Sequence, residues 1–166
     1  MSRMLEDTSL ATELEASASQ GGKKLIDRIG GRTMIERVHK IFYDKIYADQ
    51  WLGEFFAGID QKHIENQQTD FIVMLFGGPK AYSGRMPIDA HEHIMIGEEI
   101  FAARTELLRQ SLSEAGIGAA ETQDWLRIDS AFKKVLIKNS SAECKKRFFT
   151  DKILDFPKPN KFNKVS

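Results

Sequence analysis

Apolar residues recur at intervals of three and four through the middle of this 166-residue chain, and no other feature constrains its fold as strongly. Between residues 34 and 46 they occupy positions 34, 35, 38, 41, 42 and 46, and the same spacing returns after residue 60. This spacing places apolar side chains on one face of a helix. We find no internal repeat and no run of alternating apolar and polar residues. The chain is therefore predicted to be all-α.

Glycines and prolines mark the expected ends of the helices. Thr33 is the expected N-cap of the first helix. Gly77-Gly78-Pro79 ends the second, because glycine tolerates a left-handed stop and proline cannot continue a helix. The predicted segments after the first helix are a helix over residues 61–76, a loop over 80–87, a helical stretch over 88–115 that bends near Gly97, and a last core helix over 121–138.

Charge is balanced, with 24 basic and 24 acidic side chains, and this balance excludes a general nucleic-acid binder. No apolar run approaches the roughly 20 residues of a membrane span. No N-terminal stretch has the residue order of a secretory signal. The single cysteine, Cys144, cannot form an internal disulfide, which favours a reducing compartment. We therefore expect a cytoplasmic protein with no transmembrane segment and no nucleic-acid partner.

The two ends of the chain differ from its middle. Residues 1–22 carry four acidic groups against one arginine (net −3), and residues 138–166 carry eight basic groups against three acidic ones (net +5). We predict a weakly ordered N-terminal extension over 1–22, one core domain over 23–138 and a basic C-terminal extension over 139–166. Five large apolar residues of the C-terminal extension are expected to pack a short extra helix onto the core: Phe148, Phe149, Ile153, Leu154 and Phe156.

Polar residues occupy positions where the helical pattern calls for apolar ones. Gln68 continues an apolar stripe, Gln67 lies at the edge of that stripe, and Tyr43 lies at the edge of another. A glutamine that faces a core needs hydrogen-bond partners, without which it costs roughly 1–3 kcal/mol. Either Gln68 bonds a backbone carbonyl and Tyr43 keeps its hydroxyl at the surface, or these side chains serve a binding site.

Four histidines offer imidazole groups. His39 and His63 fall on the flanks of their helices and are expected to be solvated. His91 and His93 are two residues apart, so on a helix they point about 200° from each other and cannot chelate one metal ion. No spacing supports a zinc or calcium site, and no CxxCH motif supports covalent haem. A single buried histidine in an apolar slot suits haem, and His91 is one candidate for that role.

Six fragments in a fixed order carry a family resemblance: LIDRIGG at residues 25–31, FY at 42–43, FF at 55–56, QTDF at 68–71, GGPKAYSG at 77–84, and His91. Together they resemble the truncated hemoglobins of the first group, over about residues 23–138. The resemblance implies a globin-like, two-over-two helical sandwich around non-covalent haem b.

The resemblance also implies roles for individual residues. His91 takes the place of the proximal iron ligand, through Nε2, and Phe56 that of a ring stacked on the haem. Tyr43 and Gln68 form the distal pair that stabilises a bound ligand. Gln67 adjoins this pair, where some relatives carry an iron-binding histidine, so its identity favours five-coordinate iron. The other residues expected to contact the haem are Ile64, Phe71, Leu75, Tyr82, Ile96 and Phe101.

Two residues near the implied site have uncertain roles. Arg104 lies on an apolar stripe where the family usually has an uncharged group. We expect it to bury its stem and keep its head in solvent, and the alternative is a charge that reaches the pocket. His63 precedes Ile64 and reaches the iron only by swinging inward.

The function implied by the resemblance is reversible binding of dioxygen, nitric oxide or carbon monoxide, for oxygen binding or transport or for detoxification of nitric oxide. Hydrogen bonds from Tyr43 and Gln68 to partly negative bound dioxygen predict high affinity and slow release. The alternatives are a nitric-oxide dioxygenase, a gas sensor, and a globin-like module without haem. The dioxygenase needs a separate reductase, because the chain has no flavin or nicotinamide fingerprint.

Overall fold

The computed structural model describes residues 22–80 and 82–160, so the predicted N-terminal extension lies outside the described residues except for Gly22. Four longer helices are α3 (Arg32–Ala48), α4 (Gln61–Leu75), α6 (Glu98–Ala115) and α7 (Ala119–Ser130). Short elements are α2 (Leu25–Ile29), η2 (Leu52–Phe56), α5 (Pro87–Ala90), α8 (Lys133–Leu136) and η3 (Ser141–Glu143). Within these residues the β-type pairing is one isolated parallel bridge, between Ile94 and Leu154, so the all-α prediction is confirmed.

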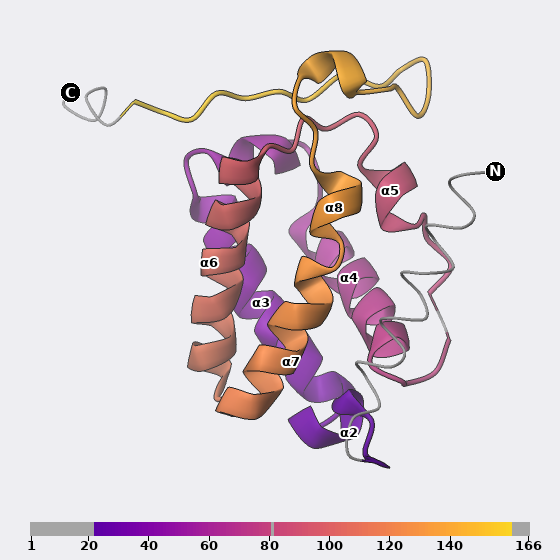
Figure 1. The fold of residues 1–166 in the computed structure, drawn as a ribbon, viewed down its shortest axis with the longest axis vertical. Coiled ribbons are helices and arrows are strands. Elements are labelled where there is room, and N and C mark those ends of the chain that lie inside the picture. Colours follow the sequence, from indigo (N-terminus) through magenta and orange to yellow (C-terminus); the bar gives the residue numbers. More distant parts are fainter. Residues whose placement is uncertain (1–21, 81, 161–166) are drawn as a thin grey trace.

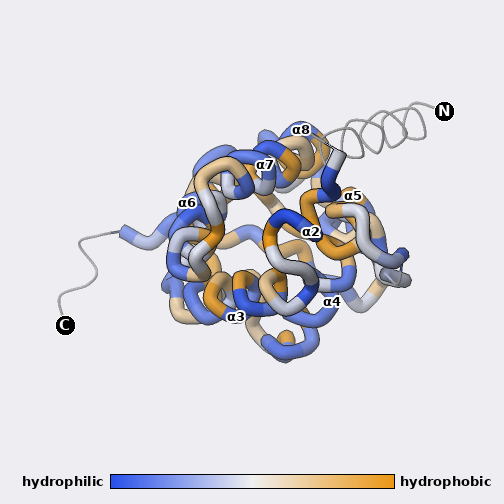
Figure 2. The backbone as a smooth tube through the Cα atoms, turned by 90° about the horizontal axis from the view of Figure 1, so that it is seen from below, coloured by the Kyte–Doolittle hydropathy of each residue, from blue (hydrophilic) through white to orange (hydrophobic). Residues whose placement is uncertain are grey.

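The longer helices form two layers. Helix α3 packs against both α4 and α6, while α7 packs against α6 and α2. In Figure 1 the pair α6 and α7 lies in front of the pair α3 and α4. Each helix has an apolar side and a polar side, which Figure 2 shows as changes of colour along the tube. The apolar sides meet between the layers. None of the described helices is long and apolar enough to cross a membrane.

Helix α4 stops where the glycines predict. Gly77 has φ +96°, a left-handed conformation that side chains other than glycine rarely adopt. At Gly78 a Cβ atom would lie 2.7 Å from the side chains of Ile26 and Val73, so α2 and α4 approach closely only because this position is glycine. Helix α3 instead begins at Arg32 after Gly31, and the prediction of Thr33 as N-cap was wrong.

The predicted helical stretch over 88–115 is interrupted. Helix α5 ends at Ala90, the next seven residues are not helical, and Gly97 is the N-cap of α6. The backbone of this interval bonds elsewhere: the amide of Met95 donates to the carbonyl of Leu154 (2.8 Å), and the amide of Leu154 donates to the carbonyl of His93 (2.9 Å). Hydrogen bonds to the distant residue Leu154 therefore take the place of helical hydrogen bonds in this interval. The last core helix also breaks, between α7 and α8.

The C-terminal extension forms no helix around its phenylalanines, which corrects the sequence prediction. Phe149 is 92% exposed and Phe148 is 51% exposed. Phe156 does pack on the core, with its ring centroid 5.0 Å from that of Phe55, and its carbonyl accepts a hydrogen bond from Trp51 Nε1 (2.8 Å). In Figure 1 this segment runs across the top of the helices, from beside α5 toward the far side of α6. It docks through backbone bonds and one aromatic anchor.

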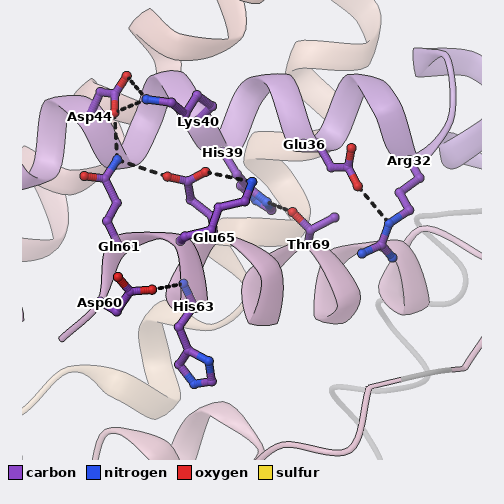
Figure 3. Close-up of polar contacts among 11 residues, drawn as sticks. Arg32, Glu36, His39, Lys40, Asp44, Asp60, Gln61, His63, Glu65 and Thr69 are labelled. Carbon is purple, nitrogen blue, oxygen red and sulfur yellow. Dashed lines mark hydrogen bonds and ion pairs between the residues drawn. The ribbon is translucent and has the colours of Figure 1, made fainter.

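His39 is buried, and the prediction that it is solvated was wrong. Its side chain is 3% exposed, and its Nδ1 is hydrogen bonded with Thr69 Oγ1 at 2.8 Å across the seam between α3 and α4 (Figure 3). Burial lowers the pKa of His39 from 6.5 to about 3, and the nearby Arg104 adds to this effect. The helix-flank pattern does not reveal that α4 covers this flank. His63 is exposed, as expected.

The lowered pKa of His39 predicts acid sensitivity. Protonation is disfavoured in the folded state, so the contribution to the free energy of unfolding is complete above pH 6.5 and is lost as the pH falls toward 3. In His39→Gln we expect the loss of stability between pH 6.5 and pH 4.5 to be smaller, by up to about 1.4 kcal/mol per pH unit. Urea denaturation across this range measures it. His63→Gln is the matched control, and equal slopes in the wild type and His39→Gln contradict the assignment.

Candidate functional site

One cavity of about 310 Å³ lies among η2, the facing sides of α3, α4 and α6, and the segment that follows α5. Its walls are mainly aromatic and aliphatic, with a few polar groups. A largely apolar cavity with a few convergent polar side chains is the usual form of a small-molecule or cofactor site. Eleven of the residues singled out in the sequence line it: Tyr43, Phe56, Ile64, Gln67, Gln68, Phe71, Tyr82, His91, Ile96, Phe101 and Arg104.

Two of the residues singled out do not line the cavity. Leu75 is half-buried near the end of α4 and packs against the core. His63 is exposed at the other end of α4, and its ring points away from the seam between α3 and α4 in Figure 3. Its backbone amide donates to the side chain of Asp60, which caps the helix at this end. The His63 side chain therefore takes no part in the cavity wall.

His91 presents a neutral imidazole to the cavity. The residue follows α5 directly, and its Nδ1 lies 2.7 Å from the carbonyl oxygen of Pro87. A carbonyl oxygen only accepts, so Nδ1 carries the proton and Nε2 keeps its lone pair. Burial lowers the pKa of His91 from 6.5 to about 4, although the Pro87 hydrogen bond opposes the shift. A neutral imidazole with its other nitrogen fixed by a carbonyl is the form in which histidine binds metals.

Polar donors from α3 and α4 line the same cavity. Tyr43 is 6% exposed, and its ring packs against Phe42 (centroids 5.0 Å apart) and Phe56 (6.0 Å). Burial raises the pKa of Tyr43, so the hydroxyl keeps its proton and remains a donor. Within residues 22–80 and 82–160 neither this hydroxyl nor the amide of Gln68 has a hydrogen-bond partner. Both groups are therefore free to donate to something in the cavity.

Arg104 reaches the cavity, which corrects the prediction that its head lies in solvent. Nη1 and Nη2 donate to the two carboxylate oxygens of Asp129 at 2.8 and 2.9 Å. The side chains are 30% and 10% exposed, and both residues line the cavity. The guanidinium carbon also lies 5.5 Å from the Phe42 ring centroid and 5.7 Å from that of Phe101. The apolar stripe thus carries a charge that Asp129 of α7 compensates.

Several lining residues were not singled out as site residues. Asp129 belongs to α7, Phe132 lies between α7 and α8, and Arg85 belongs to the loop before α5. Arg147 and Leu154 come from the C-terminal extension, far away in sequence. No local pattern marks these residues, because their place in the wall depends on how distant segments fold over the cavity.

The pairing of Arg104 with Asp129 predicts a stability effect. Asp129→Ala leaves a mostly buried cation without its partner. We expect a loss of about 1–3 kcal/mol, below the 3–5 kcal/mol typical of a fully buried pair because Arg104 retains some exposure. The double variant Arg104→Met, Asp129→Leu should recover most of that loss in urea denaturation. Arg109→Met, at an exposed pair on the same helix, is the control. A double variant less stable than Asp129→Ala contradicts the interpretation.

Comparisons with known proteins agree with this architecture. A family model described as "Bacterial-like globin" matches residues 24–140. The chain is 30% identical over 113 residues to the group 1 truncated hemoglobin of Tetrahymena pyriformis, which covers 68% of this chain and 93% of that protein. It is 30% identical over 97 residues to the group 1 truncated hemoglobin GlbN of Synechocystis sp., covering 56% of this chain and 78% of that protein.

A solved structure of the Tetrahymena pyriformis truncated hemoglobin, in its Fe(III) form, superposes with a TM-score of 0.66 at 29% sequence identity. The superposition covers 70% of this chain and 100% of that structure. The hemoglobin of Chloroflexus aurantiacus superposes with a TM-score of 0.64 at 25% identity, covering 70% of this chain and 99% of that structure.

Proposed function

Since this chain belongs to the bacterial-like globins, and among them to the group 1 truncated hemoglobins, we propose that it binds haem b non-covalently through His91. In this proposal the site takes up dioxygen and other diatomic ligands, and Tyr43 and Gln68 stabilise the ligand. Membership of the globin family supports ligand binding at a haem in general. The roles of His91, Tyr43 and Gln68 are proposed.

The observation that carries the proposal is the state of His91. The residues around it fit a haem, because one neutral imidazole with an engaged Nδ1 and an available Nε2 faces a largely apolar cavity. Bound haem iron supplies a position for reversible binding of a diatomic molecule. The carbonyl of Pro87 fixes the tautomer and the ring orientation, and increases the basicity of Nε2 as a ligand.

Tyr43 and Gln68 act on the ligand as hydrogen-bond donors. A dioxygen molecule in this site presents a partly negative outer atom, and hydrogen bonds to charged groups contribute roughly 1.5–3 kcal/mol each. Both donors lie in a cavity with few competing polar groups, which strengthens such bonds. Gln67 is exposed at the edge of the cavity and offers a further amide there. Because Gln67 is not a histidine, it would not bind the iron, and we therefore propose five-coordinate iron.

The slow dioxygen release that we predict also favours a second function. A site that retains dioxygen is better suited to reaction than to delivery, so turnover of nitric oxide with dioxygen to nitrate is the second candidate. Each such turnover consumes one electron, which a separate reductase has to supply. The donors Tyr43 and Gln68 are needed in both functions, and steady-state consumption of nitric oxide with a cellular reductase separates the enzyme from a carrier or a sensor.

Replacing His91 tests the iron ligand. We expect the purified wild type reconstituted with haem to show an intense Soret band and five-coordinate spectra in the ferrous, ligand-free form. His91→Ala should lose the band or shift it strongly, because among the described residues His93 offers the one other imidazole that lines the cavity. His63→Ala is the matched control and should keep the wild-type spectrum. A wild-type spectrum in His91→Ala overturns the assignment.

Replacing the two donors tests the distal pair. Tyr43→Phe and Gln68→Leu should each speed dioxygen release about tenfold or more, at roughly tenfold per 1.4 kcal/mol. Carbon monoxide is a weaker hydrogen-bond acceptor, so its release should change less. Stopped-flow ligand replacement measures both rates. Tyr47→Phe is the control, because Tyr47 donates to the carbonyl of Ile59 and does not line the cavity. Unchanged dioxygen release in both variants contradicts the proposed pair.

A further inference from the structure

The turn that carries His91 is held by local bonds to α5 and by a second set of bonds from a segment distant in sequence. We call residues 138–156 the C-terminal strap. The strap makes one hydrogen bond to each residue from His91 to Ile96. Residues 141–156 of the strap lie beyond the part of the chain that matches the family model.

Lys138 makes three of these six bonds. Its Nζ donates to the carbonyl oxygens of His91 (3.0 Å) and Ile94 (2.8 Å), and its backbone amide donates to the carbonyl of Ile96 (2.8 Å). Bonds from an ammonium group are stronger than those between neutral groups. The ammonium therefore ties the first residue of the turn to the residue three positions later.

The rest of the strap completes the ladder. The amide of Lys145 donates to the carbonyl of Glu92 (2.8 Å). The amide of Leu154 donates to the carbonyl of His93 (2.9 Å), and the carbonyl of Leu154 accepts from the amide of Met95 (2.8 Å). Beyond Leu154 the chain is anchored by Phe156, whose carbonyl accepts from the Trp51 indole (2.8 Å). The strap is thus bonded along the His91 turn and, beyond it, to Trp51.

The strap also forms part of the cavity wall. Leu154 and Arg147 both line the cavity with His91. Arg147 is held in place by Asp151, which accepts from its Nε (3.0 Å) and Nη2 (3.1 Å), and from its backbone amide (2.8 Å). A segment that is ordered in this way and lies in the wall contributes to the site rather than trailing from it.

We infer that the C-terminal strap positions the proximal histidine, with Lys138 as the positioning residue that sets the His91 turn against the cavity. The expected consequences, retention of haem and a fixed iron–histidine geometry, rest on the proposed function. The positioning of the turn by the strap rests only on the hydrogen bonds above. Lys138 touches neither ligand nor cofactor in this inference and acts through the backbone of His91.

Lys138→Met tests the inference, because it keeps the apolar stem and removes the ammonium. We expect haem transfer to a scavenging apo-globin to accelerate about tenfold, because two charge-assisted bonds are lost. In the ferrous, ligand-free protein the iron–histidine stretching band should shift or broaden in resonance Raman spectra. A general loss of stability does not move that band. Lys138→Arg should restore the band in part, and Lys152→Met, an exposed cation of the same strap, should behave as wild type.

Amide exchange separates failure of this inference from failure of the proposed function. In the cofactor-free protein Lys138→Met should speed exchange of the Met95 amide relative to amides of α3, while Lys152→Met should not. If the wild type takes up no haem, the proposed function fails. The exchange data alone then test whether the strap positions the His91 turn. Wild-type exchange at Met95 in Lys138→Met overturns the inference, and so does an unchanged haem-transfer rate with an unchanged stretching band.

Discussion

A stretch of non-helical backbone inside a helical protein has to find its hydrogen-bond partners in another segment. Buried amides and carbonyls without partners are costly, and a helix satisfies them internally while a turn does not. Here the non-helical stretch is the one that carries His91, and six of its backbone groups find their partners among residues 138–154. The geometry of the candidate site therefore depends on a part of the chain remote from it in sequence, and the end of the chain becomes part of the site.

Charge inside the core is arranged around the same cavity. Arg104 keeps its charge because Asp129 binds it with two hydrogen bonds. Its positive charge, added to burial, lowers the pKa of both His39 and His91, so both imidazoles stay neutral near pH 7. In His39 neutrality protects the seam between α3 and α4. In His91 it leaves a lone pair available. Burial, with the positive charge of Arg104 added to it, thus favours uncharged histidines at two places in the core.

Local patterns in the sequence predicted most of the fold and a large part of the cavity wall. The periodicity of α3 and α4 and the stop at Gly77 depend on neighbouring residues only, so they could be predicted. Tyr43, Gln68 and His91 were singled out and share one cavity, although their roles remain predictions. Burial of His39, the pairing of Arg104 and the course of the C-terminal segment could not be predicted, because each depends on a partner distant in sequence.

Tyr43 and Gln68 show what a polar donor costs in a mainly apolar cavity. A hydroxyl and an amide held beside apolar walls give up hydration when the protein folds, and that cost is recovered only by an acceptor that reaches both. Aromatic packing around Tyr43 fixes its ring, and its raised pKa keeps the proton on the hydroxyl. In the proposed function, a ligand with partial negative charge gains from these donors, whereas a weaker acceptor gains little. Selectivity among diatomic ligands would then depend on two side chains from α3 and α4, two helices that pack against each other.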